Sequence, residues 1–536
     1  MLHALIWRSV AMDYDIFIKN AMVIDGSGSA SRRQDLAVSG DSIAAIGDLD
    51  ACSAAEVLDG AGLCLCPGFI DMHAHSEFNV LIDAGRSKVM QGVTTEVCGN
   101  CGLSSAPLLG MAREQRRAAL AAYGLEPDWA TMQAYCERLD RIGLRNNVAL
   151  LAGHGNLRGS VVGYENDRAT SEQLTEMCVL LEESMECGAW GLSSGLIYSP
   201  GAFAQVGELA RLAGVVKKYG GLYATHIRNE ADLLIESITE ALEVGRAADV
   251  PVQISHLKTQ ERRNWYKLPA VLELVERARQ EGIDVAADRY PYCASSTGLD
   301  ALLPLWACRG GNAAELQRLR DPSTRSRILD ELFEHATAAE IGSGTLLARL
   351  PGEANAYLQG LSLAEAADLR GQSVGEALCD LLVEEQLDID AIFFCMSEDN
   401  LRIILRQDWV MLGSDAAVRD TTGPLARDVP HPRAFGTFAR MLAMVRDEKL
   451  MPLEEAVSKM THVPAARMGF KDRGLLKVGY RADCVLFDPQ TVRDTATYAK
   501  PQQYSVGVHA VMVNGVWAVR DGACTQQLSG RLLRQR

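Results

Sequence analysis

Residues 63–75 read LCLCPGFIDMHAH, a short apolar run that ends in two histidines spaced two residues apart. An apolar run of this length, bounded by Pro, Gly and polar residues, favours a buried strand. Residues i and i+2 of a strand point to the same side, so His73 and His75 can both face one side of a sheet. The stretch therefore predicts a strand whose end carries two candidate metal ligands.

Seven further apolar runs end in polar or glycine residues in the same way. They are VTTEVCGNCG (93–102), NVALLAGHGN (147–156), WGLSSGL (190–196), GGLYATHIRNE (220–230), VPVQISHLK (250–258), IDVAADRYPY (283–292) and WVMLGSDA (409–416). Helical patterns such as residues 171–188 and 268–282 lie between several of them. About eight β-then-α units predict an α/β fold with a (β/α)₈ TIM-like barrel, whose chemistry lies at the carboxyl ends of the strands.

The two ends of the chain show a different pattern of apolar and polar residues. Residues 14–26 and 34–49 alternate apolar and polar residues, and the pattern returns at 482–489 and 509–522, with an Asn-Gly hairpin turn. We expect a small β-sandwich domain formed from both ends, 12–66 and 470–536, around a barrel over 67–469. Residues 1–11 are expected to be a flexible N-terminal extension, and the helical excursion over 299–368 is expected to be a lid.

Composition excludes several classes of partner. The 536-residue chain is 48% hydrophobic and 23% charged, and its net charge of −16 argues against nucleic acid or an anionic membrane as its main partner. No segment is long and apolar enough to suggest a membrane span. The 14 cysteines are scattered and no secretory signal is evident, which indicates a reduced, cytoplasmic protein.

Five residues at matched strand ends suggest a metal site. Four of the 10 histidines, His73, His75, His226 and His256, stand at such ends, and Asp415 closes the last strand. A single histidine is more often a hydrogen-bonded core residue than a ligand. Five ligand-type residues at equivalent positions of one sheet reverse that expectation and favour a metal centre.

The spacing C-x-x-C of Cys98 and Cys101 admits three interpretations: a redox disulfide, half of a zinc ribbon, or two unrelated cysteines. A redox pair needs a helix start in a thioredoxin-like unit, and a ribbon needs a second pair of cysteines. Neither context is present. Cys98 is expected to be a buried strand residue. Cys101 follows a turn, so the two cysteines are not expected to function as a pair.

The motifs as a set resemble a known family. PGFIDMHAHSEF, GVTTEVCGNCGLSSAP, GHGNLRG, GAWGLSSGLIYSPG, THIRNE, ISHLK, DRYPYCASST, GSDA and HPRAFGTF follow one another in the order found in the D-aminoacylases, or N-acyl-D-amino acid deacylases, of the amidohydrolase superfamily. The closing DRGLLKVGYRADCVLFDP also resembles this family, so that the likeness covers about residues 12–520.

The resemblance implies a tightly bound zinc ion on Cys101, His226 and His256. It also implies a second, weaker metal position near His73, His75 and Asp415. Many amidohydrolases bridge two metals with a lysine on the fourth strand, but GAWGLSSGL contains none, so another anionic ligand is needed. A cysteine thiolate beside two imidazoles suits zinc and leaves a coordination position open for catalysis.

The resemblance further implies hydrolysis of the amide bond of small N-acyl-D-amino acids, giving a D-amino acid and a carboxylate. Water activated by zinc loses a proton to Asp415, which acts as general base and then returns it to the leaving nitrogen as general acid. The family's contacts with the substrate carboxylate correspond to Lys258, Tyr290, Ser296 and Arg433. An arginine fork with a lysine and hydroxyl groups is a chemically sound carboxylate site.

Two alternatives remain at this point. One is a related amidohydrolase acting on a cyclic amide or a D-residue dipeptide, and the other is a non-catalytic binding protein on the same scaffold. The choice between neutral and acidic D-amino acids also stays open. A basic residue reaching the pocket from the excursion, where Arg309, Arg318 and Arg320 occur, would favour acidic substrates.

Overall fold

The computed structural model describes residues 13–49, 52–121, 123–164 and 168–535. The N-terminal extension expected over residues 1–11 lies outside this range. None of the helices in the described part of the chain is long and apolar enough to cross a lipid bilayer.

Two sheets contain the strands that carry the candidate ligands. One has the order β17-β13-β12-β11-β10-β9 and the other β22-β8-β7-β6, and all of their strand pairs are parallel. The bounds are β6 Phe69–Asp71, β7 Val93–Cys98, β8 Asn147–Leu150, β9 Ala152–Gly153, β10 Gly191–Gly195, β11 Leu222–His226, β12 Val252–Ile254, β13 Val285–Arg289, β17 Val410–Leu412 and β22 Leu532–Leu533. The parallel α/β arrangement that the sequence predicts is therefore present.

Backbone hydrogen bonds join the two sheets at both of their edges. The amide of Met72, after β6, donates to the carbonyl of Leu412 in β17 over 3.3 Å, and Ala74 forms a parallel bridge with Ala416. At the other edge the amide of Trp190 donates to the carbonyl of Leu150 in β8 over 2.8 Å. The first and last strands of the series therefore lie beside each other, although almost 340 residues separate them.

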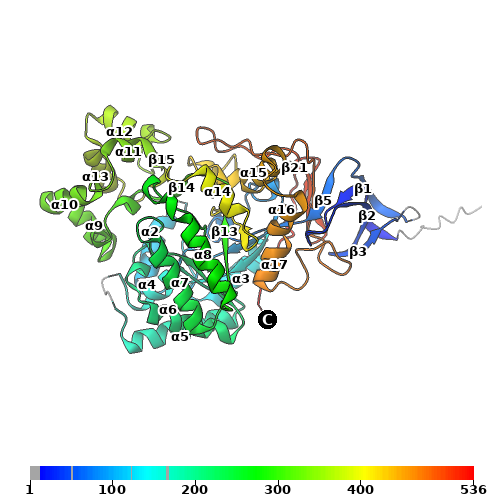
Figure 1. The fold of residues 1–536 in the computed structure, drawn as a ribbon, viewed down its shortest axis with the longest axis horizontal. Helices are drawn as coiled ribbons and strands as arrows, with labels where there is room; N and C mark the ends of the chain where they lie inside the picture. The colour runs from blue at the N-terminus through cyan, green and yellow to red at the C-terminus, as the bar shows by residue number, and fades with distance from the viewer. Residues whose placement is uncertain (1–12, 50–51, 122, 165–167, 536) are drawn as a thin grey trace, which may run out of the picture.

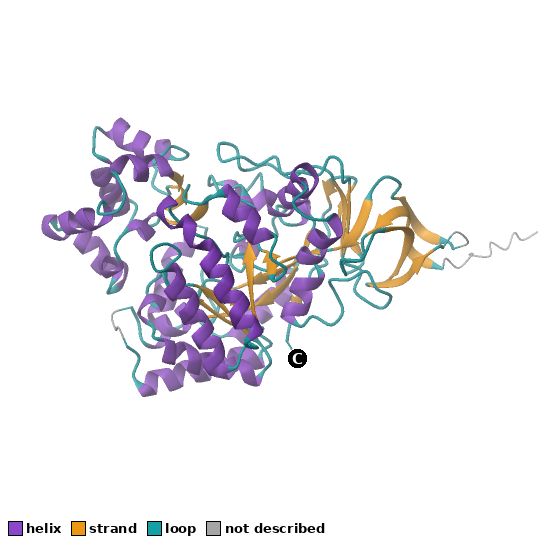
Figure 2. Ribbon diagram, viewed as in Figure 1, coloured by secondary structure: helices purple, strands orange, loops and turns teal. Residues whose placement is uncertain are grey.

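Helices cover the outer side of these strands, as Figures 1 and 2 show. They are α2 Gly110–Ala121, α3 Met132–Ile142, α4 His154–Val161, α5 Ser171–Glu186, α6 Val206–Lys218, α7 Leu234–Ala248, α8 Leu268–Gln280 and α14 Glu398–Leu405, followed by α15 Arg433–Glu448, α16 Leu453–Met460 and α17 His462–Met468. In α6, Leu209, Leu212 and Val216 are completely buried. Their spacing of three and four residues places them on one face, which packs on the sheet.

A nine-stranded sheet brings both ends of the chain together, to the right in Figure 1. It contains β1 Tyr14–Val23, β2 Arg32–Ser39, β3 Ser42–Gly47, β4 Ala54–Asp59, β5 Cys64–Pro67, β18 Cys484–Phe487, β19 Val508–Val513, β20 Val516–Arg520 and β21 Ala523–Cys524. The antiparallel pair β5 and β18 is the junction between the N-terminal and C-terminal strands.

The last strand departs from the expected range 470–536 of the sandwich. β22 pairs with β8 in the parallel sheet instead. The indole nitrogen of Trp190 donates to the carbonyl of Leu533 over 2.8 Å, and the Leu533 side chain packs against the cluster that contains Trp190. Burial of apolar surface against the parallel strands thus draws the end of the chain away from the nine-stranded sheet.

The helical excursion is longer than the expected 299–368. Its helices are α9 Gly311–Arg320, α10 Pro322–Leu332, α11 Ala338–Gly344, α12 Leu363–Arg370 and α13 Val374–Glu384, and β14 Ser295–Gly298, β15 Thr345–Arg349 and β16 Asp390–Phe393 form its antiparallel sheet. One hydrophobic cluster runs from Leu299 to Ala391 and includes Leu378. The boundary at 368 is therefore too early, because α13 and β16 complete the same core.

A buried lysine ties the first and last parallel strands together. Lys88 is completely buried, and its Nζ lies 2.6 Å from Asp71 Oδ2, 2.7 Å from Ser414 Oγ and 3.5 Å from Glu96 Oε2. Asp71 also accepts hydrogen bonds from the backbone amides of His73 and Ser414. The network therefore fixes the backbone on which His73 and its neighbours stand.

We expect Lys88→Met to lower the free energy of unfolding by about 3–5 kcal/mol, because it leaves two buried carboxyl groups without their cation. The midpoint of urea unfolding measures the effect. Lys217→Met is the matched control. Its partner Asp249 is exposed, so loss of that ion pair should cost at most about 1 kcal/mol. Equal effects of the two substitutions would contradict this account of the network.

Candidate metal centre

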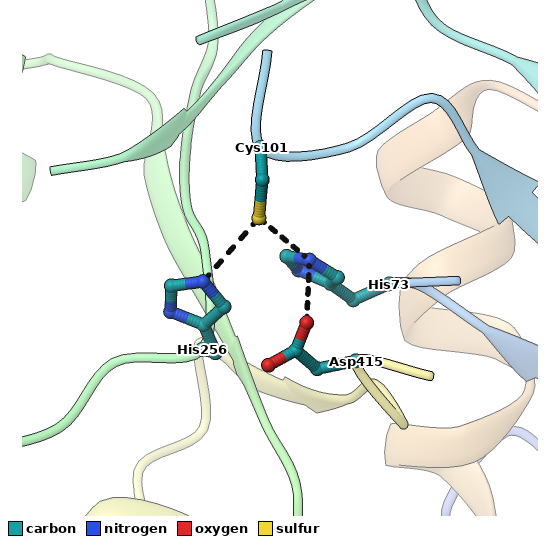
Figure 3. A group of neighbouring side chains, drawn as sticks. All are labelled: His73, Cys101, His256 and Asp415. Atoms are coloured by element: carbon teal, nitrogen blue, oxygen red, sulfur yellow. Dashed lines mark hydrogen bonds and ion pairs between the residues drawn. The ribbon is translucent and has the colours of Figure 1, made fainter. Parts of the chain in front are cut away.

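Side chains from four different strand ends, those of β6, β7, β12 and β17, meet in one buried cluster. Figure 3 shows His73, Cys101, His256 and Asp415 pointing toward one another. The Sγ of Cys101 lies 3.2 Å from His73 Nε2 and 3.4 Å from His256 Nε2, and His73 Nε2 lies 3.4 Å from Asp415 Oδ1. The Nε2 of His75 lies 3.1 Å from the same Asp415 oxygen. These donors lie as close together as ligands of a common ion.

The backbone is strained at three of the residues whose side chains form this cluster. Cys101, His256 and Asp415 have φ values of 54°, 37° and 50°, in the left-handed region that side-chain-bearing residues rarely adopt. Strain of this kind persists where the surrounding structure enforces it, and it is concentrated at functional sites. Gly99 (φ 83°) makes the turn before Cys101, and an added Cβ there would lie 2.3 Å from the carbonyl oxygen of Leu151.

The two cysteines of the C-x-x-C stretch have opposite electrostatic environments. Cys98 is completely buried in β7, and burial raises the pKa of its thiol well above the usual value. Burial acts on Cys101 in the same direction, but His73 and His256 outweigh it and hold the pKa of the Cys101 thiol well below the usual value. Only Cys101 is therefore prepared to act as a thiolate.

His226 supplies the clearest test of whether a metal fits. Its side chain is buried, and neither ring nitrogen has a hydrogen-bond partner among the described residues. The ring lies 4.3 Å from that of His256, centroid to centroid, and Nε2 is 3.7 Å from Glu230 Oε2. A buried imidazole without a partner is costly, and coordination of a cation satisfies it.

Two groups of ligand atoms have the spacing of a metal site. One contains His73, Cys101, His256 and Asp415, and the other His226, Glu230 and His256, with the ligand atoms of each within 4.8 Å of one another. Thiolate, imidazole and carboxylate donors are the ligands that zinc prefers. The grouping crosses the division expected from the sequence, because Cys101 lies with His73 and Asp415, and His256 belongs to both groups.

Asp415 lies between the histidines and an arginine. Its Oδ2 is 2.9 Å from Arg433 Nη1. Burial raises the pKa of the Asp415 carboxyl, but the charges of Arg433 and His256 outweigh it and hold the pKa well below the usual value. The carboxylate is therefore ionised and able to accept a proton.

The four expected substrate contacts occupy the same region. Lys258 Nζ pairs with Glu230 Oε1 and lies 2.7 Å from His256 Nδ1. The Arg433 guanidinium carbon lies 4.7 Å from the centroid of the Tyr290 ring, and the buried Tyr290 hydroxyl has no hydrogen-bond partner within the described part of the chain. Ser296 meets Arg433 through its carbonyl oxygen, 3.1 Å from Nη2. The hydroxyl and the guanidinium therefore offer donors to an anion.

Three site residues are absent from the sequence-based set. Glu230, in THIRNE, joins His226, His256 and Lys258. Asp288 accepts from His73 Nδ1 over 2.9 Å and from the amide of His256 over 2.8 Å, so it orients both imidazoles. Tyr198 stacks edge-on to His226, and its hydroxyl lies 3.0 Å from Thr297 Oγ1. Asp288 lies one residue before the end of β13, and this position near the carboxyl end of a strand is the sequence signal that could have identified it.

Two arginines of the excursion, Arg318 and Arg309, contact neighbouring groups. Arg318 donates to the carbonyl oxygens of Ala307 and Arg309, over 2.8 Å to the former. The Arg309 guanidinium carbon lies 5.7 Å from the centroid of the Phe203 ring. The bonds of Arg318 hold the local chain together.

Known proteins resemble this chain along almost its whole length. A family model described as "Amidohydrolase family" matches residues 56–519. The D-aminoacylase of Alcaligenes xylosoxydans xylosoxydans is 36% identical over 528 residues, which cover 98% of this chain and 99% of that one. The N-acyl-D-glutamate deacylase of the same organism is 37% identical over 527 residues, with 97% and 96% covered.

A solved structure extends the likeness to three dimensions. The N-acyl-D-glutamate deacylase of Bordetella bronchiseptica, crystallised with zinc and a phosphonate that mimics the tetrahedral intermediate, matches with a TM-score of 0.82 at 35% identity. The match covers 97% of this chain and 99% of that one. The α/β fold is thus shared with an enzyme of known activity.

Proposed function

Since the chain belongs to the amidohydrolase family, we propose that it is a zinc-dependent hydrolase of N-acyl-D-amino acids, which releases a D-amino acid and a carboxylate. The observation that carries the proposal is the buried cluster of Cys101, His73, His256 and Asp415 beside the imidazole of His226, which has no hydrogen-bond partner among the described residues. A thiolate with imidazoles and a carboxylate suits the metal, and the guanidinium of Arg433 beside them suits an anionic substrate.

We propose that zinc is held by Cys101, His226 and His256, and that His73, His75 and Asp415 form a second, weaker position. Glu230 joins His226 and His256 as a further candidate ligand. When bound, zinc polarises the scissile carbonyl and lowers the pKa of water.

Asp415 is the proposed proton carrier of the reaction. Its carboxylate removes a proton from the attacking water as the C–O bond forms, and it delivers that proton to the amide nitrogen as the C–N bond breaks. Arg433, 2.9 Å away, keeps the carboxylate ionised before the water is deprotonated. One carboxylate is sufficient, because the amine leaves only after it is protonated.

The substrate carboxylate is proposed to bind to Arg433, Tyr290, Lys258 and Ser296. Two of these carry unsatisfied donors: the Tyr290 hydroxyl and the Nε of Arg433 are buried without a hydrogen-bond partner among the described residues. A planar guanidinium and a hydroxyl on one side of the pocket fix the position of a carboxylate. Arg433 contacts Asp415 and, in this proposal, also binds the substrate carboxylate. The amide bond of the substrate is therefore held next to Asp415.

We propose a closed (β/α)₈ barrel over residues 67–469, a β-sandwich formed mainly by 13–66 and 470–524, and a lid over 295–393. The hydrogen bonds that link β6 with β17 and β8 with Trp190 support the barrel. Core clusters on the two faces of the nine-stranded sheet support the sandwich, since Leu486 belongs to one and Phe487 to the other. Fourteen free cysteines support a cytoplasmic location.

The stereochemistry of hydrolysis tests the proposed function. We expect N-acetyl-D-methionine to be hydrolysed and its L-isomer to react at least about a hundredfold more slowly, because the carboxylate contacts and Asp415 fix the side of attack. Release of free amino acid measures both rates. Preference for the L-isomer would refute the proposal, as would turnover that survives complete removal of zinc by a chelator.

A further inference from the structure

A second buried arginine adjoins the proposed carboxylate pocket. Arg289 ends β13, directly before Tyr290, and is 1% exposed. Its guanidinium carbon lies 4.2 Å from the centroid of the Tyr290 ring, and that of Arg433 lies 4.7 Å from the same centroid. The two guanidinium carbons are therefore at most about 9 Å apart.

Arg289 has no counter-ion among the described residues. Its Nη2 donates to the carbonyl oxygen of Tyr292 over 2.9 Å and contacts Met396 Sδ at 3.0 Å, and both of these partners are neutral. Its Nε and Nη1 have no hydrogen-bond partner in the described part of the chain. A buried cation held only by neutral groups is costly to fold.

The neighbouring cations differ from Arg289 in this respect. Lys258 pairs with Glu230, and Arg433 pairs with Asp415. Each of those charges is balanced before any substrate binds. Of these three cations, Arg289 alone has no counter-ion among the described residues, so its charge is available to attract an incoming carboxylate.

We propose that Arg289 is a specificity-determining residue, whose uncompensated charge selects anionic substrates by attracting the substrate carboxylate that Arg433 and Tyr290 bind. This inference rests on the proposed function. Arg289 acts at a distance and does not touch the reacting atoms. At about 9 Å and the effective dielectric constant of a protein site, one charge changes the affinity for an anion on the order of tenfold.

The alternative is that Arg289 serves only as an anchor, through its hydrogen bond to the carbonyl of Tyr292. Three substitutions separate charge from anchoring. Arg289→Lys keeps the charge and a donor, Arg289→Gln keeps a donor without the charge, and Arg289→Met has neither. If the charge matters, the Gln and Met variants share a raised KM. If the anchor matters, the Gln and Lys variants have the same KM.

The test is steady-state hydrolysis of N-acetyl-D-methionine by the full-length zinc enzyme and its three variants. We expect KM to rise about tenfold in Arg289→Gln and Arg289→Met, with kcat within about twofold, and to stay near its normal value in Arg289→Lys. Thermal unfolding without substrate provides a second readout. Removal of an uncompensated charge should leave the stability of Arg289→Met unchanged or raised, while loss of an anchor lowers it.

An unchanged KM in Arg289→Gln would overturn the inference, as would equal impairment of the Lys and Gln variants. The outcome is distinguishable from a failure of the proposed function. Absence of hydrolysis in the unaltered enzyme would refute that function itself. Hydrolysis with a KM insensitive to the charge at this position would refute only the role of Arg289.

Discussion

Asp415→Asn is expected to lower kcat by about 10³-fold or more while zinc stays bound. The amide keeps the size of the side chain but cannot take a proton from water or return one to the leaving nitrogen, and positioned acid–base groups contribute about 10²–10⁴-fold. The proposed tight ligands, Cys101, His226 and His256, are unaltered, so metal content should remain near one zinc per chain. Steady-state kinetics and elemental analysis of the same preparation measure the two quantities.

A matched control distinguishes loss of chemistry from loss of an ion pair. Asp483 is a buried aspartate that pairs with Arg473, and its backbone carbonyl accepts from Gly68, just before β6 begins. It therefore lies toward the opposite end of the strands from the cluster. Asp483→Asn should reduce stability and leave kcat of the folded enzyme unchanged. Near-normal turnover by Asp415→Asn would exclude the proposed role of Asp415.

Cys101→Ala is expected to abolish both zinc binding and hydrolysis. The substitution removes the thiolate of the cluster, and a thiolate is a strong and charge-neutralising ligand of zinc. Burial would otherwise keep a thiol neutral, but His73 and His256 hold the pKa of Cys101 well below its usual value. Zinc per chain after dialysis against a defined free-zinc buffer, together with the hydrolysis rate, measures the effect.

Cys98→Ala is the control for Cys101→Ala, since it lies three residues away in the same stretch. Cys98 is completely buried and keeps its proton, because burial raises the pKa of its thiol. Its loss should cost about 1–2 kcal/mol of stability and leave zinc content and kcat unaltered. If both variants lose zinc equally, the cysteines act as a pair and the assignment of Cys101 alone is wrong.

Much of the fold could be predicted because each strand carries its own pattern. The stretch around His73 reads as an apolar run ending in polar residues, and so do the runs that end at His226 and Asp415. Those patterns are local, and hydrophobic burial enforces them whatever the neighbours are. The ends of elements were less predictable. β22 pairs with a strand far away in sequence, whereas α13 joins the core of the excursion in which it lies, and no local pattern indicates which core a short apolar segment will choose.

The sequence by itself determined which side chains arrive at the carboxyl ends of the strands, because strand periodicity and the order of motifs are properties of the chain. Only the tertiary structure decided how their charges are distributed. It pairs Lys258 with Glu230 and Arg433 with Asp415, and it brings Asp415 to His75 across 340 residues. It also leaves Arg289 without a counter-ion among the residues that the structure describes. The physical reason is that an ion pair depends on distance and burial in space, and neither quantity follows from spacing along the chain.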